Sequence, residues 1–398
     1  MKYIILLGDG MGDFKIDELG GKTPLQAAYT PYMDSAAAKG EMGVVSTIPE
    51  GYPKGSDVAN LSIFGYDPRE YYTGRSPFEA ASINLKLAPT DVSFRCNLVN
   101  LKEEDGRVIM NDFTAGHITT DEASKIVATL QQELGDDVFS FHSGVSYRHI
   151  MVKKNGTAGL KLTPPHDISD RDVLPHLPDA EHAGDVLELM LKSRDILKDH
   201  EVNKARVAAG KLPANSIWLW GEGNAPTMPS YKEKYGLTGS VISAVDLLKG
   251  IGIAAGLDAI NVPGATGYID TDYAAKARYA LKELETKDFV YLHVEAPDEA
   301  AHEGRLDLKL KAIEDFDEKV VKAVFKGMAK FKEYKIAILC DHYTPVALKT
   351  HTDDKVPVVI YDSTNEQDYD RGYSEDEAAT GELMLARAHE IMGYMVKG

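Results

Sequence analysis

The segment that most constrains the fold is a short apolar run, residues 336–340, which lies between Lys335 and Asp341. A brief apolar run bounded by charges is typical of a buried strand in a parallel sheet. The run ends in Asp341-His342, and His351 follows nine residues after His342. Open α/β sheets bind ligands at the carboxyl ends of their strands, so we expect a site here. Oxygen and nitrogen ligands without thiolates favour Mn, Zn or Mg, although an Asp–His pair can also be a structural hydrogen bond.

A second apolar run also ends beside candidate ligands. Residues 289–294 lead into a segment that contains Asp298 and His302. A helix beginning at Pro297 would place both side chains on one face, because residues four apart in a helix are neighbours. The alternative is an aspartate favoured by the helix dipole, with an incidental histidine one turn later.

The first apolar run of the chain, residues 3–7, stops at the glycine-rich turn GDGMGD, which contains Asp9. Glycines let the backbone come close to whatever the acid binds. Three predicted strands therefore end in Asp or Asp–His groups, and together these groups supply enough ligands for two metal ions.

The order of these residues along the chain predicts an interrupted fold. Asp9 and Ser56 come early, whereas the other candidates follow residue 290. Ser56 follows a glycine and precedes a helical pattern, so we expect it at a helix N-terminus, where a capping role is the alternative interpretation. The sequence pattern changes between Leu85 and Leu212, where segments rich in helix- and strand-breaking residues separate the predicted strands and helices. We expect an α/β core of residues 1–85 and 213–398 with an inserted domain of residues 86–212. Helices are expected from Thr23 towards Gly40 and over Gly381–Met395.

Composition narrows the class of partner. The chain has 44 Lys and Arg against 62 Asp and Glu, a net charge of −18, which argues against a nucleic-acid partner but leaves a small anionic substrate open. The opening apolar run is too short for a signal sequence, and no segment reaches the length of a membrane span. Cys96 and Cys340 form no spaced motif, so we expect reduced cysteines in a cytoplasmic protein. These features of the sequence leave the oligomeric state open.

Several long motifs carry a resemblance to a known family. They are GDGMGD, KGSDVANLSIFGYDP, TGRSPFEAASI, FRCNLV, VISAVDLLKGIGIAAGLDAINVPGATG, HVEAPDEAAH and CDHYTPVALKTHTDDKVP. The sequence resembles the archaeal-type, cofactor-independent phosphoglycerate mutases of the alkaline phosphatase superfamily over nearly its whole length. The resemblance implies an alkaline phosphatase-like core, with a mostly parallel sheet flanked by helices, interrupted by an inserted smaller α/β domain.

The resemblance also implies roles for particular residues. Ser56 would be the nucleophile that carries the phosphoryl group between the two hydroxyls of phosphoglycerate, without added 2,3-bisphosphoglycerate. Two divalent ions, with Mn favoured over Mg or Zn, would activate it. The inserted domain would close over a small phosphorylated sugar acid and exclude water. The ligand sets implied are Asp9, Ser56, Asp341 and His342 for one ion, and Asp298, His302 and His351 for the other. By partial resemblance, His117 and Arg148 would bind substrate.

Other functions stay open at this point. The stretch that contains Trp218 and Trp220 resembles a bacterial branch of the family. Part of that branch is suspected of acting on homoserine in threonine synthesis. A homoserine kinase-like phosphotransferase is therefore the alternative, although the chain lacks the GxxxxGK[ST] loop that would signal a nucleotide. A plain metal-dependent phosphatase would need a site open to water. Seven suitably placed ligands argue against a non-enzymatic binding module.

Overall fold

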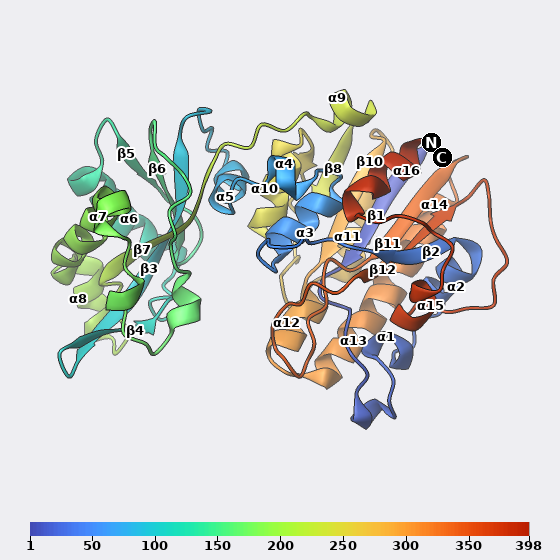
Figure 1. Ribbon diagram of the computed structural model, residues 1–398, viewed down its shortest axis with the longest axis horizontal. Helices are drawn as coiled ribbons and strands as arrows, with labels where there is room; N and C mark the ends of the chain where they lie inside the picture. Colours follow the sequence, from blue (N-terminus) through green and yellow to red (C-terminus); the bar gives the residue numbers. More distant parts are fainter. Residues whose placement is uncertain (398) are drawn as a thin grey trace. The chain divides into compact units, whose positions relative to one another are not determined.

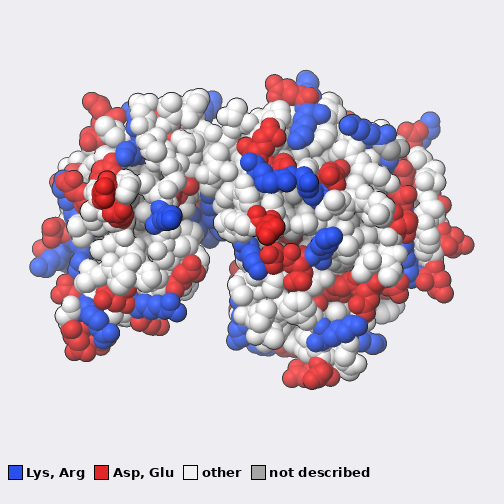
Figure 2. All heavy atoms as spheres, viewed as in Figure 1, with Lys and Arg blue, Asp and Glu red and all other residues white. Residues whose placement is uncertain are grey.

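The computed structural model describes residues 1–397 and divides the chain into two compact units. The first unit contains Met1–Tyr72 together with the chain from Met228 onward, and the second contains Thr73–Thr227. Figure 2 shows acidic and basic side chains mixed over the displayed face of both units. Among residues 1–397, every helix is too short or too polar to cross a membrane.

A seven-stranded sheet forms the centre of the first unit, in the order β2-β12-β11-β1-β10-β8-β9 (Figure 1). The strand β1 pairs in parallel with β10 and β11, and β8 pairs in parallel with β10 and β9. The strand β12 pairs antiparallel with both β11 and β2, and the other pairings are parallel, so the expected mostly parallel sheet is confirmed. The strands are β1 (Lys2–Gly8), β2 (Glu41–Val45), β8 (Gly239–Ile242), β9 (Asp258–Ala259), β10 (Phe289–Val294), β11 (Tyr334–Leu339) and β12 (Val356–Asp362).

The three strands identified from the sequence lie side by side. Every residue of β10 and β11 is buried, as is β1 from Tyr3 onward, which is why these strands are largely apolar on both faces. Gly8 pairs with Val294, and Leu7 pairs with Leu339. Because the strands are parallel and in this register, the residues that follow them emerge at one edge of the sheet.

Helices cover this sheet in two groups. One group packs around α11 and contacts β8, β10 and β12, while α3 and α10 contact each other and α10 lies against β8. The helices are α1 (Pro24–Ala27), α2 (Pro31–Lys39), α3 (Ser56–Ile63), α4 (Pro68–Tyr71), α9 (Tyr231–Tyr235), α10 (Asp246–Ala254), α11 (Tyr273–Glu283), α12 (Ala296–His302), α13 (Leu306–Phe316), α14 (Lys322–Met328), α15 (Glu375–Ala379) and α16 (Ile391–Lys397).

The second unit has a five-stranded sheet in which every pairing is antiparallel. Its order is β4-β3-β6-β5, with β7 beside β3. The strands are β3 (Val92–Glu104), β4 (Arg107–Asp112), β5 (Phe139–His142), β6 (Arg148–Lys153) and β7 (Ser216–Asn224), and the helices are α5 (Ser76–Ser82), α6 (Thr120–Leu134), α7 (Ala180–Lys198) and α8 (Glu201–Ala208). The expected interruption of the core by a smaller unit of strands and helices is confirmed.

The structural boundaries of this unit differ from those expected from the sequence. The sequence placed the insertion at residues 86–212, whereas the compact unit spans Thr73–Thr227. Two elements account for the difference. The helix α5 packs against β3 and β7, and β7 itself pairs along most of β3.

The predicted extents of two helices are wrong. The first is broken into α1 and α2 at Thr30, because Pro31 begins a new helix and restricts the residue before it. The closing helix contains only α16 after a short 3₁₀ turn. Instead of a helix, the segment from Gly381 runs along β2, with the Leu383 N–H donating to Met42 O at 3.0 Å. This segment satisfies backbone groups that an edge strand would otherwise expose.

Candidate metal centre

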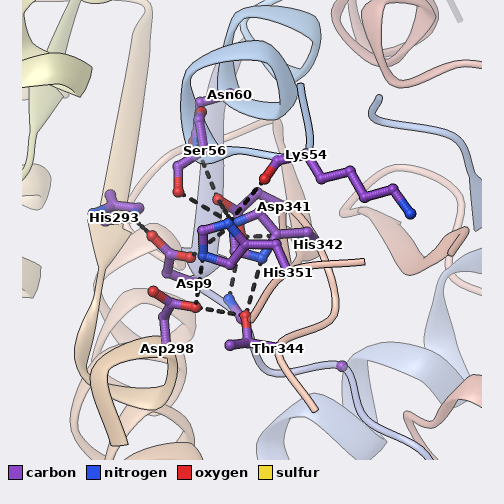
Figure 3. Close-up of polar contacts among 12 residues, drawn as sticks. Asp9, Lys54, Ser56, Asn60, His293, Asp298, Asp341, His342, Thr344 and His351 are labelled. Carbon is purple, nitrogen blue, oxygen red and sulfur yellow. Dashed lines mark hydrogen bonds and ion pairs between the residues drawn. The ribbon is translucent and has the colours of Figure 1, made fainter. Parts of the chain in front are cut away.

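The ends of β1, β10 and β11 and the start of α3 bring the candidate ligands together (Figure 3). Within residues 1–397, two groups of residues could hold a metal ion, and within each the ligand atoms lie within 4.8 Å of one another. The first group is Asp9, Asp341 and His342, and the second is Asp298, His342 and His351. His342 belongs to both, so the two groups are adjacent.

Ser56 faces the first group. Its Oγ lies 3.1 Å from His342 Nε2. The same nitrogen is 3.6 Å from Asp9 Oδ1 and 3.3 Å from Asp341 Oδ2. The N-cap of α3 is Gly55 and no side chain caps this helix, so the capping interpretation of Ser56 is excluded. The hydroxyl is directed at the acidic and imidazole groups instead.

The second group is extended by His302. The helix α12 places Asp298 and His302 on one face, as their spacing predicted, with Asp298 Oδ2 3.2 Å from His302 Nε2. Asp298 Oδ1 lies 3.6 Å from His351 Nε2. The two Nε2 atoms of His302 and His351 are only 2.9 Å apart.

Hydrogen bonds donated by the Nδ1 atoms orient all three imidazoles. His302 Nδ1 donates to Lys349 O at 2.9 Å, and His351 Nδ1 donates to Lys54 O at 3.0 Å. His342 Nδ1 lies 3.1 Å from Thr344 Oγ1, whose own hydrogen goes to Asp298 Oδ1. Each Nδ1 therefore carries a hydrogen, which leaves Nε2 as the atom that would donate its lone pair to a bound ion.

The acids and imidazoles perturb one another strongly. Burial, followed by the charges of Asp341 and Asp298, raises the pKa of Asp9 well above its usual range. Burial alone would lower the pKa of His302, but the hydrogen bond to Asp298 and its charge outweigh burial and raise the pKa to about 9. His351 has its pKa raised by the same carboxylate against the effect of burial. A positive charge is therefore favoured between these groups, and a divalent cation supplies one.

The surroundings of one carboxylate oxygen of Asp9 show whether a cation fits this centre. Asp9 Oδ1 is buried and has no hydrogen-bond partner, whereas Asp9 Oδ2 accepts a hydrogen bond from His293 Nε2 at 2.7 Å. A buried carboxylate oxygen without a donor is costly unless a cation or water satisfies it. The donor set of carboxylates, imidazoles and one hydroxyl, without thiolate, fits Mn, Mg or Zn.

Comparison with known proteins gives the family. The family model described as 2,3-bisphosphoglycerate-independent phosphoglycerate mutase matches residues 37–203. A probable 2,3-bisphosphoglycerate-independent phosphoglycerate mutase of Geobacter sulfurreducens is 55% identical over 397 residues, covering 100% of both chains. The corresponding mutase of Methanosarcina barkeri is 50% identical over 401 residues, again with 100% of both chains covered. The chain belongs to this family.

Solved structures of similar chains agree with this assignment. The PH0037 protein from Pyrococcus horikoshii has a TM-score of 0.82 at 31% identity, covering 99% of this chain and 96% of that one. The cofactor-independent phosphoglycerate mutase from Thermoplasma acidophilum has a TM-score of 0.68 at 28% identity, covering 100% and 99%. The mutase fold therefore extends along the whole chain.

Three residues around the mutase centre escaped the sequence analysis. They are His293, which holds Asp9; Asn60, which donates to Asp341 Oδ2 at 2.8 Å; and Thr344, which links His342 to Asp298. Asn60 is four residues after Ser56, so the helical spacing was a usable signal. His293 lies within the otherwise largely apolar strand β10, and nothing in its neighbouring sequence indicates its partners.

The two expected substrate residues lie in the second unit. His117 is exposed in a tight turn with a φ of 48°, and its N–H donates to Thr114 Oγ1 at 3.0 Å. Arg148 is exposed at the start of β6, with its guanidinium carbon 5.8 Å from the ring of Tyr147. The contacts described for His117 and Arg148 within residues 1–397 do not link the two side chains to each other.

A group of arginines surrounds Glu79 in the same unit. Arg75 Nε and Arg95 Nε lie 2.9 Å and 2.8 Å from the two Glu79 oxygens. Burial opposes ionisation of Glu79, but the charges of Arg95, Arg75 and Arg148 lower its pKa. The guanidinium carbon of Arg95 also lies 4.2 Å from the ring of Trp220. Two guanidinium groups pair with this one carboxylate, and the charge of Arg148 also acts on it.

Proposed function

We propose that this chain is a metal-dependent phosphoglycerate mutase that interconverts 3-phosphoglycerate and 2-phosphoglycerate without 2,3-bisphosphoglycerate. The observation that carries the proposal is Ser56 Oγ, which leads α3 and faces His342 Nε2 at 3.1 Å instead of capping its helix. A serine placed among carboxylates and imidazoles suits covalent phosphoryl transfer. Relatives named as such mutases match the chain from end to end.

In this proposal the two groups of ligands hold two divalent ions, with Mn favoured. Asp9, Ser56, Asp341 and His342 would hold one, and Asp298, His302 and His351 the other. When bound, such ions favour the serine alkoxide and neutralise charge on the transferring phosphoryl group.

The chain itself positions and protects the reacting groups. As the bond between Ser56 Oγ and phosphorus forms, the bond from phosphorus to the substrate oxygen breaks. The glycerate then turns and accepts the phosphoryl group on its other hydroxyl. The N-terminus of α3, where Ser56 lies, favours the negative charge that accumulates there.

The second unit would bind the rest of the substrate. A phosphoglycerate carries a carboxylate, and arginine suits planar, bidentate recognition of carboxylate or phosphate. Arg148 adds its charge to the group formed by Arg75, Arg95 and Glu79, which supports an anion site in a chain of net charge −18. His117 would assist from its turn. Closure of this unit over bound substrate would exclude water and prevent hydrolysis.

The decisive assay supplies 3-phosphoglycerate and Mn, without bisphosphoglycerate or ATP, and couples product formation to enolase. We expect turnover under these conditions. Phosphorylation of homoserine that requires ATP would replace the proposal with a kinase, and release of inorganic phosphate as the main product would replace it with a phosphatase. We also propose a cytoplasmic location, which the buried, unpaired Cys96 and Cys340 support.

A further inference from the structure

The interior strand β10 presents two buried polar side chains towards the metal centre. Tyr291 and His293 are both fully buried and lie two residues apart, so they project from the same face of the strand. A buried polar group is tolerated only when its hydrogen bonds are satisfied, and both residues satisfy theirs around the acidic ligands.

His293 is fixed in one tautomer by its neighbours. The Val245 N–H donates to Ser243 Oγ at 2.9 Å, and Ser243 Oγ lies 3.1 Å from His293 Nδ1. His293 Nε2 lies 2.7 Å from Asp9 Oδ2. When Asp9 is ionised, as a metal ligand is, an Nε2 without its hydrogen would place two lone pairs against each other at this distance. The Ser243 hydroxyl therefore donates to Nδ1, and Nε2–H donates to the carboxylate.

This hydrogen bond leaves the other oxygen of Asp9 open. His293 occupies Oδ2, while the buried Oδ1 has no hydrogen-bond partner and lies 3.6 Å from His342 Nε2. The backbone of His293 is also anchored, because Lys276 Nζ donates to His293 O at 3.1 Å. Asp9 is therefore held with one oxygen presented to the centre.

Tyr291 acts on the other acidic ligand through Asn60. The Tyr291 hydroxyl donates to Asn60 Oδ1 at 2.6 Å, which directs the amide nitrogen away from the tyrosine. Asn60 Nδ2 then donates to Asp341 Oδ2 at 2.8 Å and to Ser56 O at 2.9 Å. A flipped amide would place its oxygen against both acceptors. The ring of Tyr291 is held by stacking on Phe64, with centroids 3.9 Å apart.

We propose that β10 is a positioning strand for the first metal group, in which His293 orients Asp9 and Tyr291 orients Asp341 and the backbone of Ser56 through Asn60. Neither residue is itself a ligand. Hydrogen bonds of this kind fix the direction of a ligand and keep it ionised, and removing them typically weakens metal binding about 10- to 100-fold. The inference rests on the proposed metal centre and adds the residues that set its affinity.

The test measures Mn binding to the purified, metal-free protein by calorimetry, so that it does not depend on catalysis. His293→Phe removes both hydrogen bonds of the imidazole and keeps an aromatic ring. We expect one Mn site to weaken about 10- to 100-fold and the other to change little. His293→Gln retains an N–H that can reach Asp9 Oδ2, so it should recover most of the lost affinity. A purely structural role would not distinguish the two ions or be rescued by glutamine.

Tyr291→Phe tests the positioning role of Tyr291 against a matched control. Tyr231 is also buried, and its hydroxyl donates to Phe64 O at 2.6 Å, so Tyr231→Phe loses a comparable hydrogen bond. We expect Tyr291→Phe to weaken the same Mn site as His293→Phe, and Tyr231→Phe to leave both sites unchanged. For the imidazole, His149→Phe in the second unit is the corresponding buried control.

The outcomes separate this inference from the proposed function. Wild-type affinity at both sites in His293→Phe would overturn the role of His293. If that variant does not fold, equal Mn affinities in Tyr291→Phe and Tyr231→Phe would overturn the positioning strand. A wild-type chain that binds two Mn ions but shows no mutase turnover would refute only the proposed function, whereas one that binds no Mn would refute both.

Discussion

Loss of Lys309 should weaken the first unit strongly without touching a proposed ligand. Its ammonium is completely buried and donates to Gly12 O at 3.0 Å, Asp13 Oδ2 at 2.9 Å and Thr344 O at 2.9 Å. It therefore joins the loop after β1 to the loop after β11, the two loops that carry Asp9 and Asp341. Burial lowers the pKa of Lys309, while Asp13 opposes that shift.

Lys309→Met keeps most of the side-chain volume and removes the charge and all three donors. Breaking a buried ion pair by removing one partner costs about 3–5 kcal/mol, and each orphaned acceptor adds about 1–3 kcal/mol unless it finds water. We expect a loss on the order of 5 kcal/mol in the free energy of unfolding. Since whole domains are stable by about 5–15 kcal/mol, the variant should be partly unfolded at modest urea concentrations.

Urea unfolding in chelator, followed by circular dichroism, measures this loss without interference from metal binding. Most of the cost comes from the uncompensated Asp13 carboxylate, so Lys309→Met combined with Asp13→Asn should be more stable than Lys309→Met alone by about 1–3 kcal/mol. Lys335→Met is the matched control, because its partner Asp362 keeps 19% of its side chain exposed and water can replace the lysine. A loss below about 1 kcal/mol in Lys309→Met, or strictly additive effects in the double variant, would refute the reasoning.

Three further outcomes follow from the metal centre and the second unit. Exhaustive chelation should abolish turnover and added Mn should restore it, as measured with the enolase-coupled assay; full activity with no metal by elemental analysis would end the metal hypothesis. The folded pKa of His302 is raised from 6.5 to about 9, so in metal-free protein its stabilising contribution should be complete below about pH 6.5 and lost as the pH rises towards about 9. Mn should remove this pH dependence of the melting temperature, because metal binding displaces the proton. Arg148→Ala should lower mutase turnover strongly with Mn content unchanged, and should raise the fraction of turnovers that release inorganic phosphate; turnover equal to wild type would remove Arg148 from the substrate site.

The part of the fold that could be predicted is the part with a strong local signal. Residues 3–7, 289–294 and 336–340 are apolar except for His293 and end abruptly in acids or glycine, and all three became adjacent buried strands. The spacing of Asp298 and His302 placed both on one face of α12 in the same way.

The parts that escaped prediction depend on contacts between distant segments. Whether Gly381 onward forms a helix is decided by β2, which offers unpaired backbone groups to the segment. The boundary at Tyr72 depends on α5 packing against β3 and β7. His293 carries no local sign of its role, because its partners Asp9 and Ser243 are brought to it only by the pairing of neighbouring strands.

The most direct test of the central claim is to trap the phosphoryl group on the enzyme. Mn-loaded protein mixed briefly with 3-phosphoglycerate, quenched in acid and digested, should yield a peptide phosphorylated on Ser56 by mass spectrometry. Ser56→Ala should fold normally, give no such peptide and have no measurable turnover. A Ser56→Ala variant that still isomerises 3-phosphoglycerate, or a phosphoryl group trapped on another residue, would contradict the account.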